Sequence, residues 1–316
     1  MKSEYKMSSQ GSRLFSCLAI LIAGSLWGCM GIFVRGFQSW GLSSMQMVSL
    51  RAILATVFLG IYLYVRDRKL LKIRQKDLWC FVGTGILSIV FFSFCYYQTI
   101  QLTDLSAAAI LLYTAPAMVM VMSAFLFHER LTGVRIFALL LAFAGCTLVS
   151  GLTGNTHLTT IGVLTGLGSG FGYALYSIFS RYALDRGYRS MTITFYTFAF
   201  AAAAVTWFVH PIELFRQATA SPAHIGFSLL YGLFSTIIPY ILYTYGLQGT
   251  ENGTASIIAS IEPVVASLIG IILYGEHPSL PTIAGILLVL ASIVICNLPG
   301  LSRRSQAALT HDCKKP

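Results

Sequence analysis

The chain contains ten apolar runs, each about 20 residues long, separated by short polar connections. A hydrocarbon core of about 30 Å is crossed by about 20 helical residues, so each run matches one transmembrane helix. This pattern predicts an all-α integral membrane protein with ten transmembrane helices. The runs are Leu14–Val34, Ser44–Val65, Leu78–Ile100, Leu105–Phe127, Gly133–Gly151, Thr160–Ser180, Ser190–His210, His224–Gly246, Gly253–Tyr274 and Leu280–Leu298.

Composition supports a membrane location and excludes several functions. Of the 316 residues, 56% are hydrophobic and 10% are charged, whereas soluble domains carry about 25% charge. The net charge of +10 comes from short basic groups between apolar runs, which is typical of cytoplasmic loops, so we expect a lipid bilayer and no nucleic acid as partner. The seven cysteines include no Cys-x-x-Cys pair, and we expect no metal site and no cofactor.

The distribution of basic residues predicts the orientation. Of the 21 lysines and arginines, only Arg35, Arg51 and Arg216 lie outside the N-terminal segment, the second, fourth and sixth connections and the C-terminal segment. Cytoplasmic loops are enriched in Lys and Arg. We therefore expect a multi-pass protein of the plasma membrane, in a bacterium the inner membrane, with both termini cytoplasmic.

The two halves of the sequence resemble each other at an offset of about 147 residues. Pro116 matches Pro263 and Glu129 matches Glu276, each proline preceding its glutamate by 13 residues. Each half holds five predicted helices, an odd number, so the second half enters the membrane upside down. We expect two inverted five-helix repeats, residues 14–151 and 160–298, flanked by cytoplasmic tails of residues 1–13 and 302–316. Inverted repeats are typical of secondary transporters, whose substrate site lies near the midplane.

Short motifs in both halves carry a family resemblance. Tyr113-Thr114-Ala115-Pro116 and Phe127-His128-Glu129-Arg130 in the first half, and Ile261-Glu262-Pro263 and Tyr274-Gly275-Glu276 in the second, resemble the EamA-type repeat of the drug/metabolite transporter superfamily. The likeness covers nearly the whole chain. It implies ten helices in two inverted repeats, and members of this family commonly export amino acids and related metabolites.

Two charged residues lie deep in predicted helices, Arg51 and Glu262. A charge at membrane depth is costly unless it is paired or faces water, so each is a candidate substrate-binding residue. A structural pair between the two, or a side chain that snorkels toward the membrane surface, is the alternative. Pro116 and Pro263 interrupt the fourth and ninth runs; each removes one helical hydrogen bond, and we expect either a hinge or a packing kink.

Aromatic residues gather in the same helices, and their rings suit an apolar or cationic solute. Interfacial anchoring and ordinary packing are the alternatives. Glu129 and Glu276 end the fourth and ninth runs at opposite membrane faces and are candidate gates; solvated helix ends are the alternative. The candidate substrate-binding residues, with Gln98 as an added polar candidate, are Trp27, Arg51, Tyr96, Gln98, Tyr113, Tyr176, Tyr243 and Glu262.

These patterns predict a secondary transporter that works by alternating access around a midplane cavity and exports amino acids or related small metabolites. A channel or an uptake carrier for a small organic cation is the alternative. We expect no enzyme, because the histidines lie in loops or near helix ends and no acidic pair lies at membrane depth. The expected partners are a small-molecule substrate and lipid, and the protein is expected to be a monomer or homodimer.

Overall fold

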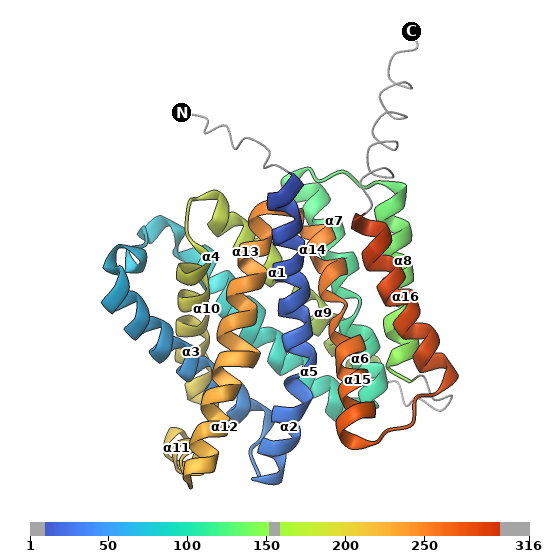
Figure 1. Cartoon of the computed structure of the whole chain (residues 1–316). Helices are drawn as coiled ribbons and strands as arrows, with labels where there is room; N and C mark the ends of the chain where they lie inside the picture. Colours follow the sequence, from blue (N-terminus) through green and yellow to red (C-terminus); the bar gives the residue numbers. More distant parts are fainter. Residues whose placement is uncertain (1–9, 152–158, 298–316) are drawn as a thin grey trace, which may run out of the picture.

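The structure is a computed structural model that describes residues 10–151 and 159–297. The predicted tails, residues 1–13 and 302–316, lie largely or wholly outside the described residues. Within those ranges the regular structure is entirely helical (Figure 1). Among the described residues, nine helices are long and apolar enough to span a membrane, and the shorter apolar helix Gly133–Val149 completes the ten predicted spans.

The first repeat crosses the bundle five times, and three of its crossings are built from more than one segment. A π-helical segment, η3, divides the third crossing, and the fourth is broken just before Pro116. The segments are α1 (Gln10–Gly28) with α2 (Met30–Ser39), α3 (Ser44–Arg66), α4 (Leu78–Val82) with η3 (Gly83–Val90) and α5 (Phe91–Leu102), α6 (Leu105–Leu112) with α7 (Ala115–Phe127), and α8 (Gly133–Val149). The turns η1 (Arg68–Leu71) and η2 (Gln75–Asp77) join α3 to α4.

The third and fourth crossings of the second repeat have the same construction, with a π-helical segment, η5, and a break before Pro263, whereas its first crossing is a single helix. Short helices η4 (Thr206–Phe208) and α11 (Pro211–Ala218) lie between its second and third crossings. The crossings are α9 (Thr160–Asp185), α10 (Ser190–Val205), α12 (Pro222–Gly232) with η5 (Leu233–Ile237) and α13 (Ile238–Gly249), α14 (Asn252–Ala259) with α15 (Glu262–Tyr274), and α16 (Leu280–Asn297).

The offset of the sequence repeat appears in the element boundaries. The helices α6 and α14 have 8 residues each, and α7 and α15 have 13 each. The residues that end α7 and α15, His128 and Gly275, both adopt the left-handed conformation that terminates a helix. In Figure 1 the pair α6–α7 and the pair α14–α15 run in opposite directions through the bundle. The two repeats are therefore inverted, as predicted.

The repeats interleave through close helix contacts. The helix α1 packs against α13, α14 and α15 of the second repeat, and α9 packs against α5, α6 and α7 of the first. Gly24 of α1 lies against the α14–α15 break, where an added Cβ would sit 3.0 Å from the Ala259 carbonyl oxygen. Gly170 of α9 lies in the same way against the α6–α7 break, 3.1 Å from the Leu111 carbonyl oxygen. Each break is thus covered by a glycine of the other repeat.

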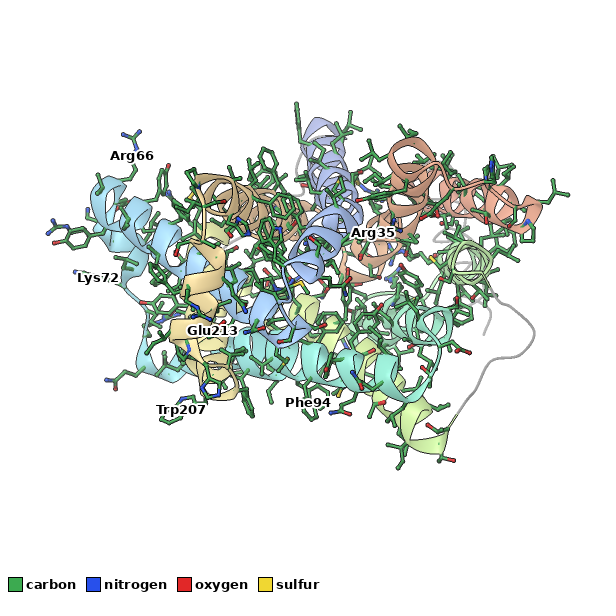
Figure 2. All side chains as sticks on the ribbon, turned by 90° about the horizontal axis from the view of Figure 1, so that it is seen from below. Arg35, Arg66, Lys72, Phe94, Trp207 and Glu213 are labelled. Atoms are coloured by element: carbon green, nitrogen blue, oxygen red, sulfur yellow. The ribbon has the colours of Figure 1, made fainter. Side chains whose placement is uncertain are left out.

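The bundle has two distinct ends and an apolar periphery. The start of α1 and the end of α16 lie at one end, called the terminal face below, and α2, α11 and the end of α15 lie at the opposite face (Figure 1). Figure 2 looks along the bundle from the opposite face; in this view Phe94 and Trp207 project outward from the edge of the bundle and Arg35 lies among the helices. Large apolar side chains are exposed around the periphery, as expected for a surface that contacts lipid.

Candidate functional site

Glu262 lies where the interrupted ninth crossing resumes, as the first residue of α15. Its side chain is half-buried, and its carboxyl group is within electrostatic range of the hydroxyls of Tyr96, Tyr113 and Tyr173. No ion pair within residues 10–151 and 159–297 includes it. The break in the helix therefore presents an acidic group among phenols, without a basic partner in the described chain.

A ring cluster built around Trp27 lies beside this break. The Trp27 ring centroid is 5.2 Å from that of Tyr240, 5.3 Å from that of Tyr243 and 6.4 Å from that of Tyr173. Gly28, next to Trp27, faces the backbone carbonyl of Glu262, which an added Cβ would approach to 2.6 Å. The rings and the acidic residue thus belong to one region between α1, α9, α13 and α15.

The ring cluster is tightly closed. It borders a cavity of about 20 Å³, which is room for about one water molecule. Two phenols are fixed by hydrogen bonds, with 2.8 Å between the Tyr176 hydroxyl and Thr244 Oγ1, and 2.7 Å between the Tyr243 hydroxyl and Ser177 Oγ. The indole Nε1 of Trp27 is buried and has no hydrogen-bond partner in the part of the chain that the structure describes. A buried donor left unpaired is costly, so this nitrogen is suited to a ligand atom.

Glu129 anchors the terminal face. Its carboxylate accepts hydrogen bonds from the backbone N–H groups of Asn252 (2.8 Å) and Gly253 (3.2 Å), the first residues of α14. Arg181 of α9 donates to Asn252 Oδ1 (3.0 Å) and to the Thr250 carbonyl. Burial raises the pKa of Glu129 above its ordinary value, and the backbone hydrogen bonds offset only part of this effect. The contact joins the end of α7 to the second repeat.

A related contact is found at the opposite face. Arg35 Nη2 lies 2.8 Å from Glu276 Oε1, and both side chains are 53% exposed. The Arg35 guanidinium also lies 3.9 Å from the centroid of the Tyr274 ring. Arg35 and Arg181 occupy matching positions in the repeats, as do Glu276 and Glu129. Each end of the bundle therefore places an arginine of one repeat near a glutamate of the other. The two side chains are half-buried at the terminal face and exposed at the opposite face.

The sequence profile of the EamA-like transporter family matches residues 14–151 and 160–298. The chain belongs to the EamA-like transporter family. This is a family of membrane transporters, and the chain is accordingly a multi-pass membrane protein.

Similar proteins agree with this assignment. An uncharacterized transporter of Archaeoglobus fulgidus is 30% identical, over 88% of this chain and 94% of that protein. The uncharacterized inner membrane transporter YicL of Salmonella typhimurium is 22% identical, over 94% of this chain and 100% of that protein. A crystal structure with 18% identity superimposes with a TM-score of 0.74, covering 94% of this chain and 99% of that one. At that identity the match shows the shared fold.

The structure of this EamA-like transporter does not pair Arg51 with Glu262, the structural alternative considered from the sequence. Arg51 is 4% exposed and lies within electrostatic range of Tyr231 and Tyr240. Its Nε has no hydrogen-bond partner in the described ranges. The reason for the separation is packing, because α3 contacts α10 and α12, whereas α15 contacts α1 and α8.

The remaining predicted residues lie in several different places. Tyr96 and Tyr113 lie near Glu262, and Tyr176 and Tyr243 belong to the ring cluster. Gln98, half-buried on α5, is two residues from Tyr96 and so points to a different side of the helix. Pro116 and Pro263 are each the second residue of the helix that follows a break.

Two tyrosines of the ring cluster belong to the aromatic residues of the predicted pocket helices but were not among the candidate substrate-binding residues. Tyr173 and Tyr240 both contact Trp27, and Tyr240 also contacts Tyr176 with ring centroids 5.0 Å apart. The sequence spacing points to both of them, because each lies three residues before a candidate tyrosine and residues three apart share a helix face.

Proposed function

We propose that this EamA-like transporter is a secondary transporter that exports amino acids or related small metabolites by alternating access. The observation that carries the proposal is a contact between the repeats at each end of the bundle, made by matching glutamates, Glu129 at the terminal face and Glu276 at the opposite face. Glu129 is bonded into the first turn of α14 at the terminal face, whereas Arg35 and Glu276 meet in an exposed pair at the opposite face. Alternating access requires two such closures around one site, opened in turn.

The chemistry between the two closures supports an amino acid as the substrate class. Glu262 offers a negative group among phenols, which suits an ammonium group. The Nε1 of Trp27, which has no hydrogen-bond partner among the described residues, offers a donor, which suits a carboxylate oxygen. A zwitterionic amino acid carries both the ammonium group and the carboxylate that these two residues would bind. Export as the direction rests on the resemblance to exporters of the drug/metabolite transporter superfamily.

A small organic cation is a second candidate, favoured by the aromatic rings and by the lack of a basic partner for Glu262 in the described chain. Purified protein reconstituted into liposomes separates the candidates. We expect labelled amino acids to exchange with unlabelled amino acids on the other side, with no conductance in planar bilayers. Exchange of quaternary amines but not of amino acids would show that the substrate is a small organic cation. A steady conductance would show that the protein is a channel and not a carrier.

We also propose that the terminal face is cytoplasmic and that the membrane is the plasma membrane. The basic connection between α3 and α4 lies on this face (Figure 1), and basic connections are typical of the cytoplasmic side. The test uses a cysteine-free background with a single cysteine at one of two exposed positions. These are Gln75, on this face, and Ser279, between α15 and α16 on the opposite face. An impermeant thiol reagent should label the Ser279 position in intact cells and spare the Gln75 position; the reverse pattern contradicts the orientation.

A further inference from the structure

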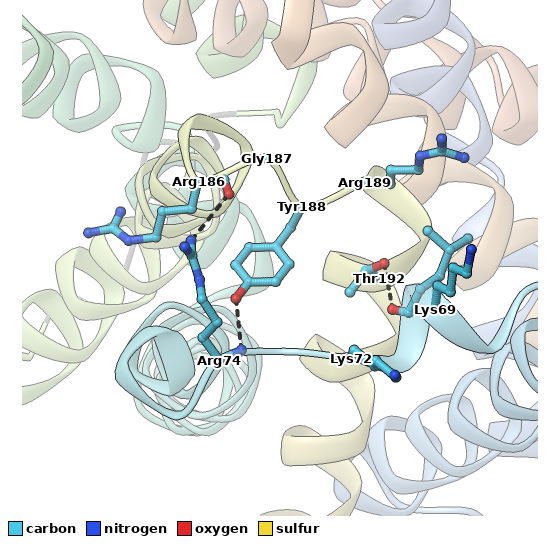
Figure 3. A pocket seen from close by; sticks show the side chains of 9 residues that line it. Lys69, Lys72, Arg74, Arg186, Gly187, Tyr188, Arg189 and Thr192 are labelled. Carbon is cyan, nitrogen blue, oxygen red and sulfur yellow. Dashed lines mark hydrogen bonds between the residues drawn. The ribbon is translucent and has the colours of Figure 1, made fainter. Parts of the chain in front are cut away.

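A basic pocket lies on the terminal face, away from the residues assigned to transport. It is formed between the connection that follows α3 and the turn that joins α9 to α10, and its volume is about 260 Å³ (Figure 3). Five cationic residues line it, and its lining includes no acidic residue. They are Lys69, Lys72, Arg74, Arg186 and Arg189. Such a pocket favours an anion.

The walls of the pocket are held in place by polar contacts between the two repeats. The Tyr188 hydroxyl accepts from the Arg74 backbone N–H (3.0 Å) and donates to Asp77 Oδ2 (2.8 Å). Thr192 Oγ1 donates to the Leu70 carbonyl oxygen (2.9 Å). The pocket is therefore a built feature of the fold, in which the connection of the first repeat is bonded to α10 and to the turn of the second.

Only part of the positive charge is neutralised. Asp77, which is 3% exposed, pairs with Arg74 (2.8 Å) and Arg186 (3.1 Å). Lys69, Lys72 and Arg189 are exposed and form no ion pair within residues 10–151 and 159–297. In Figure 3 these three lie on the other side of Tyr188 from Arg74 and Arg186. They come from both repeats and leave one side of the pocket with uncompensated charge.

An apolar groove begins beside this pocket. Its volume is about 730 Å³, and α3, α10 and the α12–η5–α13 crossing line it. Met191, at the start of α10, lines the groove, while Arg189 and Thr192 on either side of it line the basic pocket. The groove therefore reaches the pocket at the first turn of α10. Tyr62 of α3 and Leu230 of α12, which also line it, are exposed toward the lipid.

We propose that an anionic phospholipid of the leaflet at the terminal face binds here, its phosphate in the basic pocket and one acyl chain in the groove. The charge and the adjoining apolar groove complement the two parts of such a lipid, whereas a free phosphate ion fits the pocket alone. Because Lys69 and Lys72 belong to the first repeat and Arg189 to the second, the bound lipid connects the repeats. The assignment of this leaflet as cytoplasmic rests on the orientation proposed above, but the binding does not.

Lipid binding to the purified full-length protein in neutral detergent tests the proposal. Phosphatidylglycerol, phosphatidylcholine and soluble glycerol 3-phosphate are added separately, and the bound lipid is measured by native mass spectrometry alongside the melting temperature. We expect phosphatidylglycerol to bind and raise the melting temperature more than phosphatidylcholine does, since ligands of the folded state stabilise it. A response to glycerol 3-phosphate equal to that of phosphatidylglycerol would overturn the assignment to a lipid.

A charge-neutralising variant locates the site. In Lys69→Gln/Lys72→Gln/Arg189→Gln we expect phosphatidylglycerol affinity to fall about tenfold or more, because each basic side chain near the membrane surface contributes to anionic lipid binding. The matched control is Arg66→Gln/Arg68→Gln/Lys76→Gln, which removes the same charge from exposed residues that do not line the pocket. Equal losses in the two variants, or equal affinities for phosphatidylglycerol and phosphatidylcholine in the wild type, would show that no such site exists.

Discussion

Glu262 occupies a position where two physical effects oppose each other. As the first residue of α15, its carboxylate is favoured by the N-terminal end of the helix dipole. Its half-buried surroundings of phenol rings and apolar side chains disfavour a charge that has no counter-ion. A bound cationic group, or a proton, relieves this opposition. This is the residue-scale reason to place Glu262 in the transport cycle.

Replacing Glu262 by Gln tests this role. The variant keeps the shape of the side chain and removes the charge, so we expect a melting temperature close to that of the wild type and a loss of transport of about tenfold or more. Exchange in proteoliposomes across a pH series is the measurement. Glu213→Gln, in an exposed pair with Arg216, is the control and should transport normally. Wild-type transport by Glu262→Gln with unchanged pH dependence would remove Glu262 from the cycle.

Trp27 allows binding and packing to be separated. Trp27→Phe keeps a ring in the cluster and removes the unpaired Nε1 donor, so we expect substrate affinity to fall about fivefold to tenfold, the value of one hydrogen bond. Trp27→Ala should instead lower the free energy of unfolding by about 3–5 kcal/mol, because the side chain is buried.

Thermal-shift titration with the transported substrate measures the affinity, and denaturant unfolding without substrate measures the free energy of unfolding. Trp207→Phe, on a residue that is 89% exposed, is the control for a change of indole to phenyl. If Trp27→Phe binds substrate with unchanged affinity, Trp27 serves in packing alone.

At the scale of elements, the two broken crossings depend on the glycines that cover them. Gly24→Ala places a methyl group 2.7 Å from Ile261 Cγ2, and Gly170→Ala places one 2.7 Å from Thr114 Oγ1. Both contacts are too short and involve residues at the breaks, so we expect each variant to lose about 1–3 kcal/mol of stability.

Thermal unfolding in detergent measures the loss. Gly31→Ala is the matched control, because nothing lies within 4 Å of the added methyl group and alanine favours the helix. Unchanged melting temperatures for Gly24→Ala and Gly170→Ala would mean that the breaks adjust freely to the covering helices.

The elements were largely predictable from the sequence, and the details within them were not. Runs of about 20 apolar residues specify the spans, because lipid replaces water along their whole length. Pro116 and Pro263 predicted the interruptions, but not that each span becomes two separate helices, α6 and α7 or α14 and α15. The π-helical segment η3 contains no proline and has no comparable signal, whereas η5 directly precedes α13, whose second residue is Pro239.

The site was less predictable, because hydropathy does not report how a helix is rotated. In a membrane protein the lipid-facing and interior sides are both apolar, so the side of α3 that carries Arg51 was not defined by the sequence. Arg51 consequently lies near Tyr231 and Tyr240 rather than near Glu262. The ring partners of Trp27 likewise come from α9 and α13, and their meeting depends on packing between the repeats.

At the scale of the whole molecule, the inverted repeats place matching residues at the two ends of the bundle. The contacts that these residues make differ between the two ends. At the terminal face Arg135 also pairs with Glu251, the residue before α14, so this end is held by α7, α8 and α9 together. At the opposite face Arg35, Glu276 and Tyr274 form an exposed contact. Alternating access requires a motion that loosens the contacts at the terminal face while it tightens those at the opposite face, and that then reverses.

The closed contact at the terminal face is expected to respond to pH. Burial, together with the nearby Glu251, raises the pKa of Glu129 above its ordinary value of 4.5, while Arg181 and the α14 backbone act in the other direction. In the proposed alternating-access cycle this end opens, which would expose Glu129 and return its pKa toward the ordinary value. A group whose pKa is raised in the closed state stabilises that state below pH 4.5, and this stabilisation is lost as the pH rises through the raised pKa.

Opening of the terminal face should therefore increase with pH above the ordinary glutamate range. The measurement uses a single cysteine in place of Thr254, which is 1% exposed in α14 behind this contact, and follows its labelling in purified cysteine-free protein. The rate is divided by that of a cysteine at exposed Gln75, which removes the pH dependence of the thiol itself. Glu129→Gln cannot ionise, so its corrected rate should be independent of pH. A pH-dependent rate that persists in Glu129→Gln would assign the response to another group.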